Sequence, residues 1–85
     1  MRYPAILTKD GRHLFAEFPG CPGLFTGGYP HEIEALAEDA LALWLETRLD
    51  EGRPIPEPRR RVTPSRGERV LWVKVPAELA ARIGE

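Results

Sequence analysis

The chain contains, at residues 30–52, the stretch PHEIEALAEDALALWLETRLDEG, which predicts one long amphipathic helix. Proline suits the first turn of a helix, glutamates suit its positive end, and Gly52 suits the position just past its C-terminus. We therefore predict a helix from Pro30 to Glu51. Counted from Ile33 at about 100° per residue, the apolar residues within about 80° predict its buried face. These are Leu36, Ala37, Ala40, Leu41, Leu43 and Trp44.

The rest of this helix carries acidic residues together with two leucines. The set consists of Glu34, Glu38, Asp39, Leu45, Glu46 and Leu49. Leu45 and Leu49 fall about 120° and 160° from Ile33, outside the predicted buried stripe. Two interpretations remain open at this point. The face is either an ordinary solvated helix surface with exposed leucines, or an interface with another protein.

Short strands precede the helix. Residues 3–9 and 12–18 flank Asp10-Gly11, a dipeptide typical of a two-residue β-hairpin loop. Pairing outward from that turn predicts one apolar face, made of the opposed pairs Leu7 with Leu14, Ala5 with Ala16 and Tyr3 with Phe18. Pro-Gly dipeptides at 19–20 and 22–23 then predict a tight turn that feeds a third strand at residues 24–26.

The segment after the helix begins with alternating prolines. Residues 53–58 read RPIPEP, which excludes helix and sheet interior and predicts an extended arm. A basic loop follows at 59–68. Residues 69–75 alternate as a fourth strand, and a short helix begins at Pro76 or Ala77.

These elements predict an α+β fold in which an antiparallel sheet packs on one long helix, in the order β-β-β-α-β with a short terminal helix. We divide the chain into a core at 1–58, the basic loop at 59–68 and a strand and helix at 69–85. The last part completes the fold or forms an oligomer interface.

The length and composition favour one small soluble domain. The 85 residues are 42% hydrophobic and 29% charged, as in ordinary globular proteins. No apolar run approaches the roughly 20 residues that cross a bilayer, so we expect a cytoplasmic protein with no membrane partner. The single cysteine, Cys21, cannot form an internal disulfide. Because so small a domain buries little surface, we expect a homo-oligomer, either a dimer or a tetramer.

Charge is divided unevenly along the chain. Residues 1–52 hold four basic and nine acidic side chains, for a formal charge of −5, whereas residues 53–85 hold eight and four, for +4. The basic part includes Arg59, Arg60, Arg61 and Arg66. These arginines form either an arm that binds nucleic-acid phosphates, including operator DNA, or a solvated linker that balances the acidic helix of a neighbouring subunit. Trp72 is the only aromatic residue near them.

The sequence offers little for catalysis. His13, Cys21 and His31 lie on a predicted hairpin, turn and helix start, without the spacing of a metal site or a catalytic dyad. The carboxylates Asp10 and Glu17 join no acidic cluster of the kind that holds magnesium ions. We therefore predict no catalytic residue, no metal and no cofactor, and a protein that is not an enzyme.

Taken in order, several of these motifs resemble the HicB-type antitoxin family. They are the hairpin, the Pro19-Gly20-Cys21 turn, the helix with Leu43-Trp44-Leu45, and the exit Gly52-Arg53-Pro54-Ile55-Pro56-Glu57-Pro58. The resemblance covers residues 3–58 and extends weakly to 69–75. It implies a partial ribonuclease-H-like fold, and a protein that binds and silences a small basic HicA-type toxin, which cleaves mRNA with a histidine.

The resemblance gives the acidic helix a role. A protein that cleaves RNA carries a basic surface, and acidic side chains complement it. We therefore expect Glu34, Glu38, Asp39, Leu45, Glu46 and Leu49 to contact the toxin.

Two other functions remain. Many HicB proteins add a DNA-binding domain, but after Arg69 only one strand and one short helix fit, so a DNA-binding autoregulator would need a reduced ribbon-helix-helix shared between two chains. The other alternative is a non-catalytic oligomeric scaffold that has lost its toxin.

Overall fold

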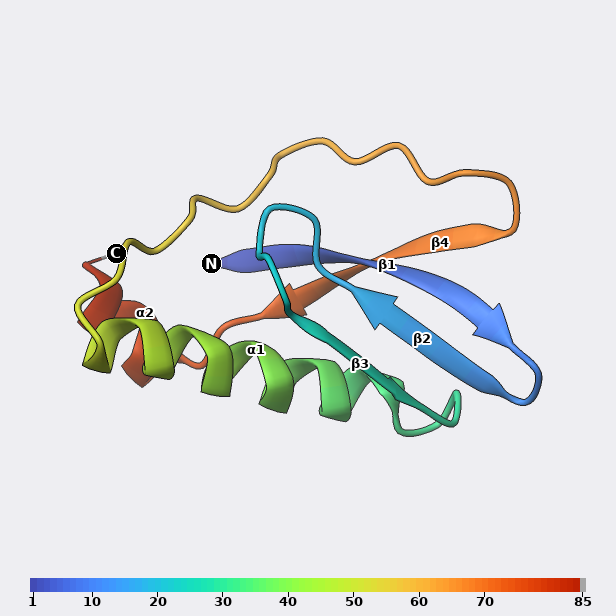
Figure 1. Ribbon diagram of the computed structural model, residues 1–85, viewed down its shortest axis with the longest axis horizontal. Helices are drawn as coiled ribbons and strands as arrows, with labels where there is room; N and C mark the ends of the chain where they lie inside the picture. The colour runs from blue at the N-terminus through green and yellow to red at the C-terminus, as the bar shows by residue number, and fades with distance from the viewer. Residues whose placement is uncertain (85) are drawn as a thin grey trace.

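The fold is a four-stranded antiparallel sheet with its helices on one face, seen in a computed structural model that describes residues 1–84 (Figure 1). The strands lie in the order β3-β2-β1-β4. The elements are β1 (Arg2–Asp10), β2 (His13–Glu17), β3 (Phe25–Gly28), α1 (Ile33–Asp50), β4 (Glu68–Lys74) and α2 (Ala77–Ile83). The predicted α+β class and the order β-β-β-α-β are confirmed.

The first hairpin differs from its prediction by two residues. Asp10 pairs with His13 and Leu7 with Ala16, so the loop residues are Gly11 and Arg12 rather than Asp10 and Gly11. Only Gly11 in this loop has a positive φ, of 62°, whereas the predicted type I′ turn needs positive φ at both central residues. Glycine at the first loop position is instead the pattern of a type II′ turn. A shift of two residues keeps each side chain on its predicted face.

The two Pro-Gly dipeptides form two tight turns in succession. The N–H of Cys21 donates to the Phe18 carbonyl, and the N–H of Leu24 donates to the Cys21 carbonyl, each at 3.1 Å. Gly20 and Gly23 have φ of 86° and 80°, as the third residue of a type II turn requires. The turns end at β3, which begins at Phe25, one residue later than predicted.

Helix α1 begins at Ile33, three residues after the predicted start at Pro30. The N–H groups of Glu32 and Ile33 both donate to the Tyr29 carbonyl, so residues 29–32 form a turn that precedes the helix. Glu32 occupies the N-cap position without a side-chain cap hydrogen bond. Glu34 lies in the first turn, where its charge complements the positive end of the helix.

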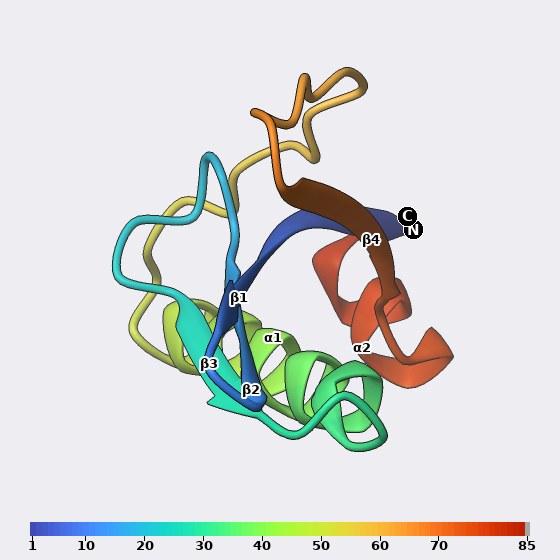
Figure 2. The same ribbon diagram turned by 90° about the vertical axis from the view of Figure 1, so that its right-hand side faces the viewer.

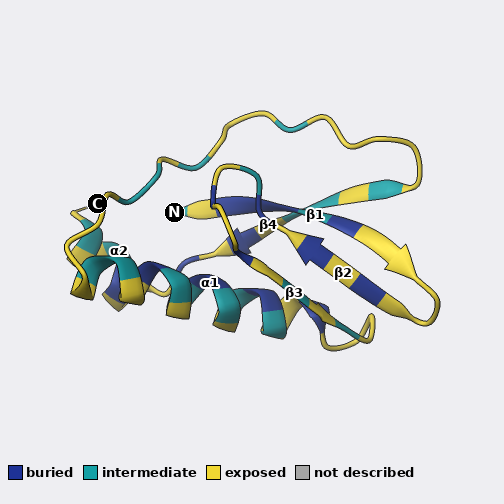
Figure 3. Cartoon of the chain, viewed as in Figure 1, coloured by how far each residue is buried: buried dark blue, intermediate teal, exposed yellow. Residues whose placement is uncertain are grey.

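The buried face of α1 also differs from its prediction. It is the row Ile33, Ala37, Leu41 and Leu45. Figure 3 shows buried segments recurring along α1. Each step of four residues advances about 40° around the helix, so this row rotates by about 120° along α1. Sheets twist, and their line of contact with a straight helix rotates in the same way. Counting from Ile33 alone therefore placed Leu45 wrongly: it is 0% exposed, whereas Leu43, predicted to be buried, is 66% exposed.

The core lies between this row and the inner face of the sheet. Tyr3, Ala5 and Leu7 of β1 face it together with Leu14 and Ala16 of β2, as the alternation predicted. Val73 of β4 and Leu79 of α2 extend the core at its other end. Leu49 is half-buried against this cluster. The core therefore joins all the sheet strands except β3 to both helices.

Strand β4 belongs to this sheet and pairs antiparallel with β1, with Ala5 opposite Leu71. It follows an arm, residues 53–67, that leaves the end of α1 and lies on the side of the sheet away from α1 (Figures 1 and 2). The Tyr3 hydroxyl donates to the Pro56 carbonyl at 2.7 Å, and Ile55 packs against the core. The first half of the arm is therefore attached to the domain.

Candidate functional site

An apolar groove lies between α1 and the segment that leads into β3. Pro22, Leu24 and Phe25 form one side, and Ala40, Leu43, Trp44, Thr47 and Arg48 form the other. Its volume is about 620 Å³. Phe25 is 60% exposed and Leu43 is 66% exposed, so both sides present large apolar side chains to solvent. Such exposed apolar surface in a small domain typically marks a site of contact with another molecule.

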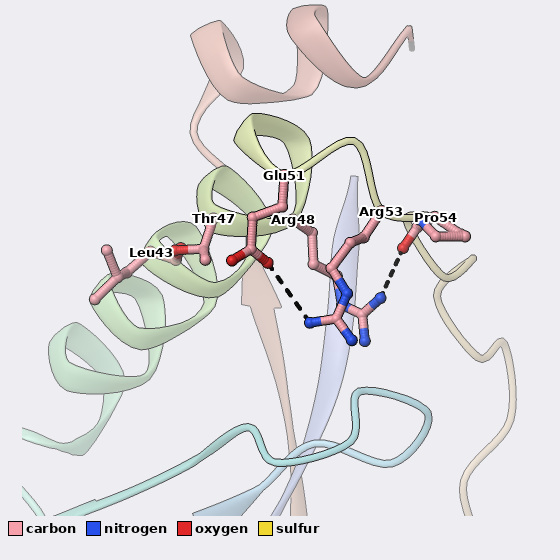
Figure 4. Close-up of polar contacts among 6 residues, drawn as sticks. All are labelled: Leu43, Thr47, Arg48, Glu51, Arg53 and Pro54. Atoms are coloured by element: carbon pink, nitrogen blue, oxygen red, sulfur yellow. Dashed lines mark hydrogen bonds and ion pairs between the residues drawn. The ribbon is translucent and has the colours of Figure 1, made fainter.

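Two arginines, Arg48 and Arg53, make the polar contacts at the end of the groove near the C-terminus of α1 (Figure 4). Arg48 lies over the Trp44 ring, with its guanidinium carbon 4.3 Å from the ring centroid, and donates to the Pro54 carbonyl at 3.0 Å. Arg53 pairs with Glu51 at 3.5 Å. These contacts fix the exit of the helix, and they place two cationic side chains at one end of the apolar groove. The Nε of Arg48 is buried without a hydrogen-bond partner among the described residues.

The predicted acidic residues divide between two sides of α1. By their positions on the helix, Asp39 and Glu46 lie within about 60° of Leu43. Both are exposed. Glu34 and Glu38 lie about 180° and 140° from Leu43, on the other side of the helix. None of these four carboxylates lines the groove, whose one acidic lining residue in the described part of the chain is Glu51; Asp39 and Glu46 only neighbour its Leu43 edge.

The two leucines predicted with these acids need correction. Leu45 is wholly buried in the core and presents no surface to a partner. Leu49 is half-buried and packs against the core. The large apolar residue that this helix exposes is Leu43, which the sequence pattern assigned to the core. Centring the buried face on the whole row of residues four apart would have placed Leu43 about 140° from the core direction.

Cys21 is a buried side chain of the double turn. It is 3% exposed, and burial raises the pKa of its thiol above the ordinary value of 9.0, partly offset by the nearby Arg48 and Arg59. A raised pKa keeps the thiol protonated and weakly nucleophilic at neutral pH. Cys21 therefore serves as a small apolar core residue.

The two histidines lie in one row of stacked rings. His13 stacks on Tyr29 with ring centroids 4.5 Å apart, and Tyr29 stacks on His31 at 5.9 Å. Sequence reasoning treated them as separate, because one lies on the hairpin and the other precedes α1. Within residues 1–84, no three side chains of His, Cys, Asp or Glu gather as metal ligands would.

The basic residues of the arm separate into two groups. Arg59 and Arg60 line a hollow together with Arg2 and Trp72, whereas Arg61 and Arg66 do not. Sequence reasoning had no signal for the contribution of Arg2, which lies at the other end of the chain. Neither helix within residues 1–84 is both long and apolar enough to span a bilayer.

No family model matches the sequence, and no curated protein sequence matches it. Solved structures do match. A chain of the HicA3 and HicB3 toxin–antitoxin complex superposes with a TM-score of 0.70 at 26% identity, covering 89% of this chain and 99% of that one. The antitoxin HicB3 crystal structure superposes with a TM-score of 0.74 at 26% identity. This alignment covers 89% of the present chain and 62% of the HicB3 chain.

Proposed function

We propose that this chain, which has the fold of the HicB-type antitoxins, is the antitoxin of a toxin–antitoxin pair and binds a HicA-type toxin. The structural likeness to HicB3, alone and in its complex with HicA3, supports an antitoxin role. In this proposal the chain carries out no chemistry. It silences a toxin that cleaves mRNA by occupying the surface on which the RNA would lie.

The proposed contact surface is the groove between α1 and β3. The observation that carries this assignment is the pair of exposed apolar residues on the two sides of the groove, Leu43 and Phe25. Asp39 and Glu46 are exposed and lie four and three residues from Leu43 on the same side of α1. Buried apolar residues at the centre of an interface contribute most of its affinity. Acidic side chains at the rim attract a basic RNA-cleaving partner and accelerate its association.

The two acidic flanks of α1 provide a matched pair of variants. We propose that Asp39 and Glu46 contact the toxin directly, whereas Glu34 and Glu38 add only long-range attraction. D39N/E46Q and E34Q/E38Q each remove two negative charges from the same helix. Both should slow association, by roughly threefold in low salt, because both weaken the attraction. Only D39N/E46Q should also accelerate dissociation, because only it removes contacts made in the complex.

The binding partner for this test is the small basic protein encoded by the reading frame adjacent to that of this chain. Association and dissociation rates are measured by surface biosensor at low and moderate salt, and cleavage of an RNA by the partner is measured with and without this chain. A neighbouring frame that encodes no small basic protein would contradict the proposal. Equal dissociation rates for the two double variants would contradict the assignment of the toxin interface to the groove.

A further inference from the structure

A second candidate site lies on the outer face of the sheet, where basic side chains surround an exposed tryptophan. Trp72 of β4 is 42% exposed and is paired with Pro4 of β1. Side chains alternate along a strand, so Trp72 points away from the core-facing Val73. The next outward-facing pair along the two strands is Arg2 with Lys74. Two cationic residues thus lie beside the indole on the strands themselves.

The arm supplies two more arginines to this place. Arg59, Arg60, Arg2 and Trp72 line one hollow of about 480 Å³, together with Pro58 and Glu57. Glu57 is the one acidic residue in that lining, against three arginines. The hollow therefore carries net positive charge around an aromatic ring, and Lys74 adds to it from the neighbouring position of β4.

These arginines are attached to the domain. Three residues before Arg59, the Pro56 carbonyl accepts a hydrogen bond from the buried Tyr3 hydroxyl. The Arg59 side chain packs closely on the two Pro-Gly turns of residues 18–24. A Cβ added at Gly20 would lie 3.2 Å from the Nε of Arg59. Side chains held in place lose less entropy when they bind than those of a free linker. Arg61 and Arg66 are exposed and lie outside the hollow.

We propose that this hollow binds one nucleotide unit of a single-stranded nucleic acid, with a base stacked on Trp72 and phosphates contacted by Arg2, Arg59 and Arg60. Aromatic rings bind unpaired bases by stacking, and arginines bind phosphates by charge-assisted hydrogen bonds. A duplex buries the faces of its bases, so a single strand fits the exposed indole better. Trp72 faces away from the core, which lies between the sheet and α1, so the site is compatible with a protein bound in the groove.

The test measures binding of fluorescein-labelled oligo(U) and oligo(dT), about ten nucleotides long, to the full chain by anisotropy at low salt. Intrinsic fluorescence of a W44F variant isolates Trp72, because the chain has two tryptophans. We expect saturable binding and quenching of Trp72 fluorescence. Three arginine–phosphate contacts predict a slope of about −2 in a plot of log affinity against log salt concentration. Comparison of the two oligonucleotides shows whether the site prefers RNA or DNA.

Matched variants distinguish binding in the hollow from non-specific electrostatic attraction to the basic arm. R60Q and R66Q remove the same charge from the same arm, but only Arg60 lines the hollow. We expect R60Q to weaken binding severalfold more than R66Q. W72L should weaken it about tenfold, and W72F should restore much of that loss because phenylalanine still stacks.

Three results would overturn the proposal. One is the absence of saturable binding even at low salt. The second is equal loss in R60Q and R66Q, which would show only diffuse attraction by the arm. The third is a W72L variant that binds oligonucleotide normally but sediments as a smaller species than the unaltered chain, which would assign Trp72 to self-association.

Discussion

The pair Leu45 and Leu43 offers a direct test of the structure, because two leucines on the same helix should behave in opposite ways. Leu45 is 0% exposed in the core between α1 and the sheet, whereas Leu43 is 66% exposed beside the groove. Leu45→Ala removes a buried side chain and leaves a cavity, which costs about 2–5 kcal/mol. A domain of this size has a free energy of unfolding of roughly 4–13 kcal/mol, so the loss is a large fraction of the total. Leu43→Ala should change it by less than about 0.5 kcal/mol.

The assay is urea unfolding followed by circular dichroism, with the midpoint and slope fitted separately. Leu43→Ala should keep the unfolding curve of the original chain but accelerate dissociation of the toxin, by about five- to thirtyfold for a central apolar contact. The reverse pattern would refute the assignment of the buried face of α1. In that pattern, Leu45→Ala would stay stable but bind the toxin more weakly, and Leu43→Ala would be destabilised. The helix face predicted from Ile33 alone, which buries Leu43 and exposes Leu45, would give this result.

Three further predictions concern the turn, the arm and the buried thiol. Gly11→Ala should lower the free energy of unfolding by about 1 kcal/mol, because alanine disfavours the positive φ at this position. The control Arg12→Ala, in the same loop, should change it by less than about 0.5 kcal/mol. Equal urea midpoints for the two variants would contradict the turn assignment. Tyr3→Phe removes the hydrogen bond to the Pro56 carbonyl; it should cost about 1 kcal/mol and make residues 55–62 more susceptible to limited proteolysis, and unchanged susceptibility there would show that this bond does not hold the arm. Burial raises the pKa of the Cys21 thiol in the folded state, so the stability it contributes is present at neutral pH and is lost as pH rises above about 9.0. The difference in unfolding free energy between the original chain and Cys21→Ala should therefore shrink between neutral pH and about pH 10, and a constant or growing difference would count against a buried thiol.

The strands were predictable because their signal is local. Alternation with a period of two assigned Tyr3, Ala5 and Leu7 to the core, and that face is buried. The hairpin register was wrong by two residues because Asp10-Gly11 and Gly11-Arg12 both fit a two-residue loop with glycine at one position. The sequence around the turn does not separate a type I′ turn from a type II′ turn, whereas the pairing of the whole strands does.

The buried face of α1 was less predictable because it depends on what the helix packs against. A helix on a twisted sheet is buried along a rotating row, and a single reference residue such as Ile33 cannot show that rotation. The exchange of Leu43 and Leu45 follows from this. The sequence therefore predicted a contact surface on α1, the helix that borders the groove, but it chose the buried Leu45 in place of the exposed Leu43. The assignment of Asp39 and Glu46 to that surface stays a prediction.

The hollow around Trp72 was beyond sequence reasoning for a different reason. It joins Arg2 at the start of the chain to Arg59 and Arg60 in the arm and to Trp72 in the last strand. Only the pairing of β1 with β4 and the hydrogen bond between Tyr3 and Pro56 bring these segments together. Contacts between residues so distant in sequence leave no periodic signal.

An antitoxin that acts through the groove can be tested by inhibition of the adjacent-gene toxin, with this chain and with its Leu43→Ala variant. The purified toxin is assayed for cleavage of an RNA at increasing antitoxin concentration. We expect the chain to abolish cleavage near equimolar ratio, and Leu43→Ala to need a markedly higher concentration while folding normally. Cleavage that continues at saturating antitoxin, or equal inhibition by the chain and Leu43→Ala, would contradict an antitoxin that acts through the groove between α1 and β3.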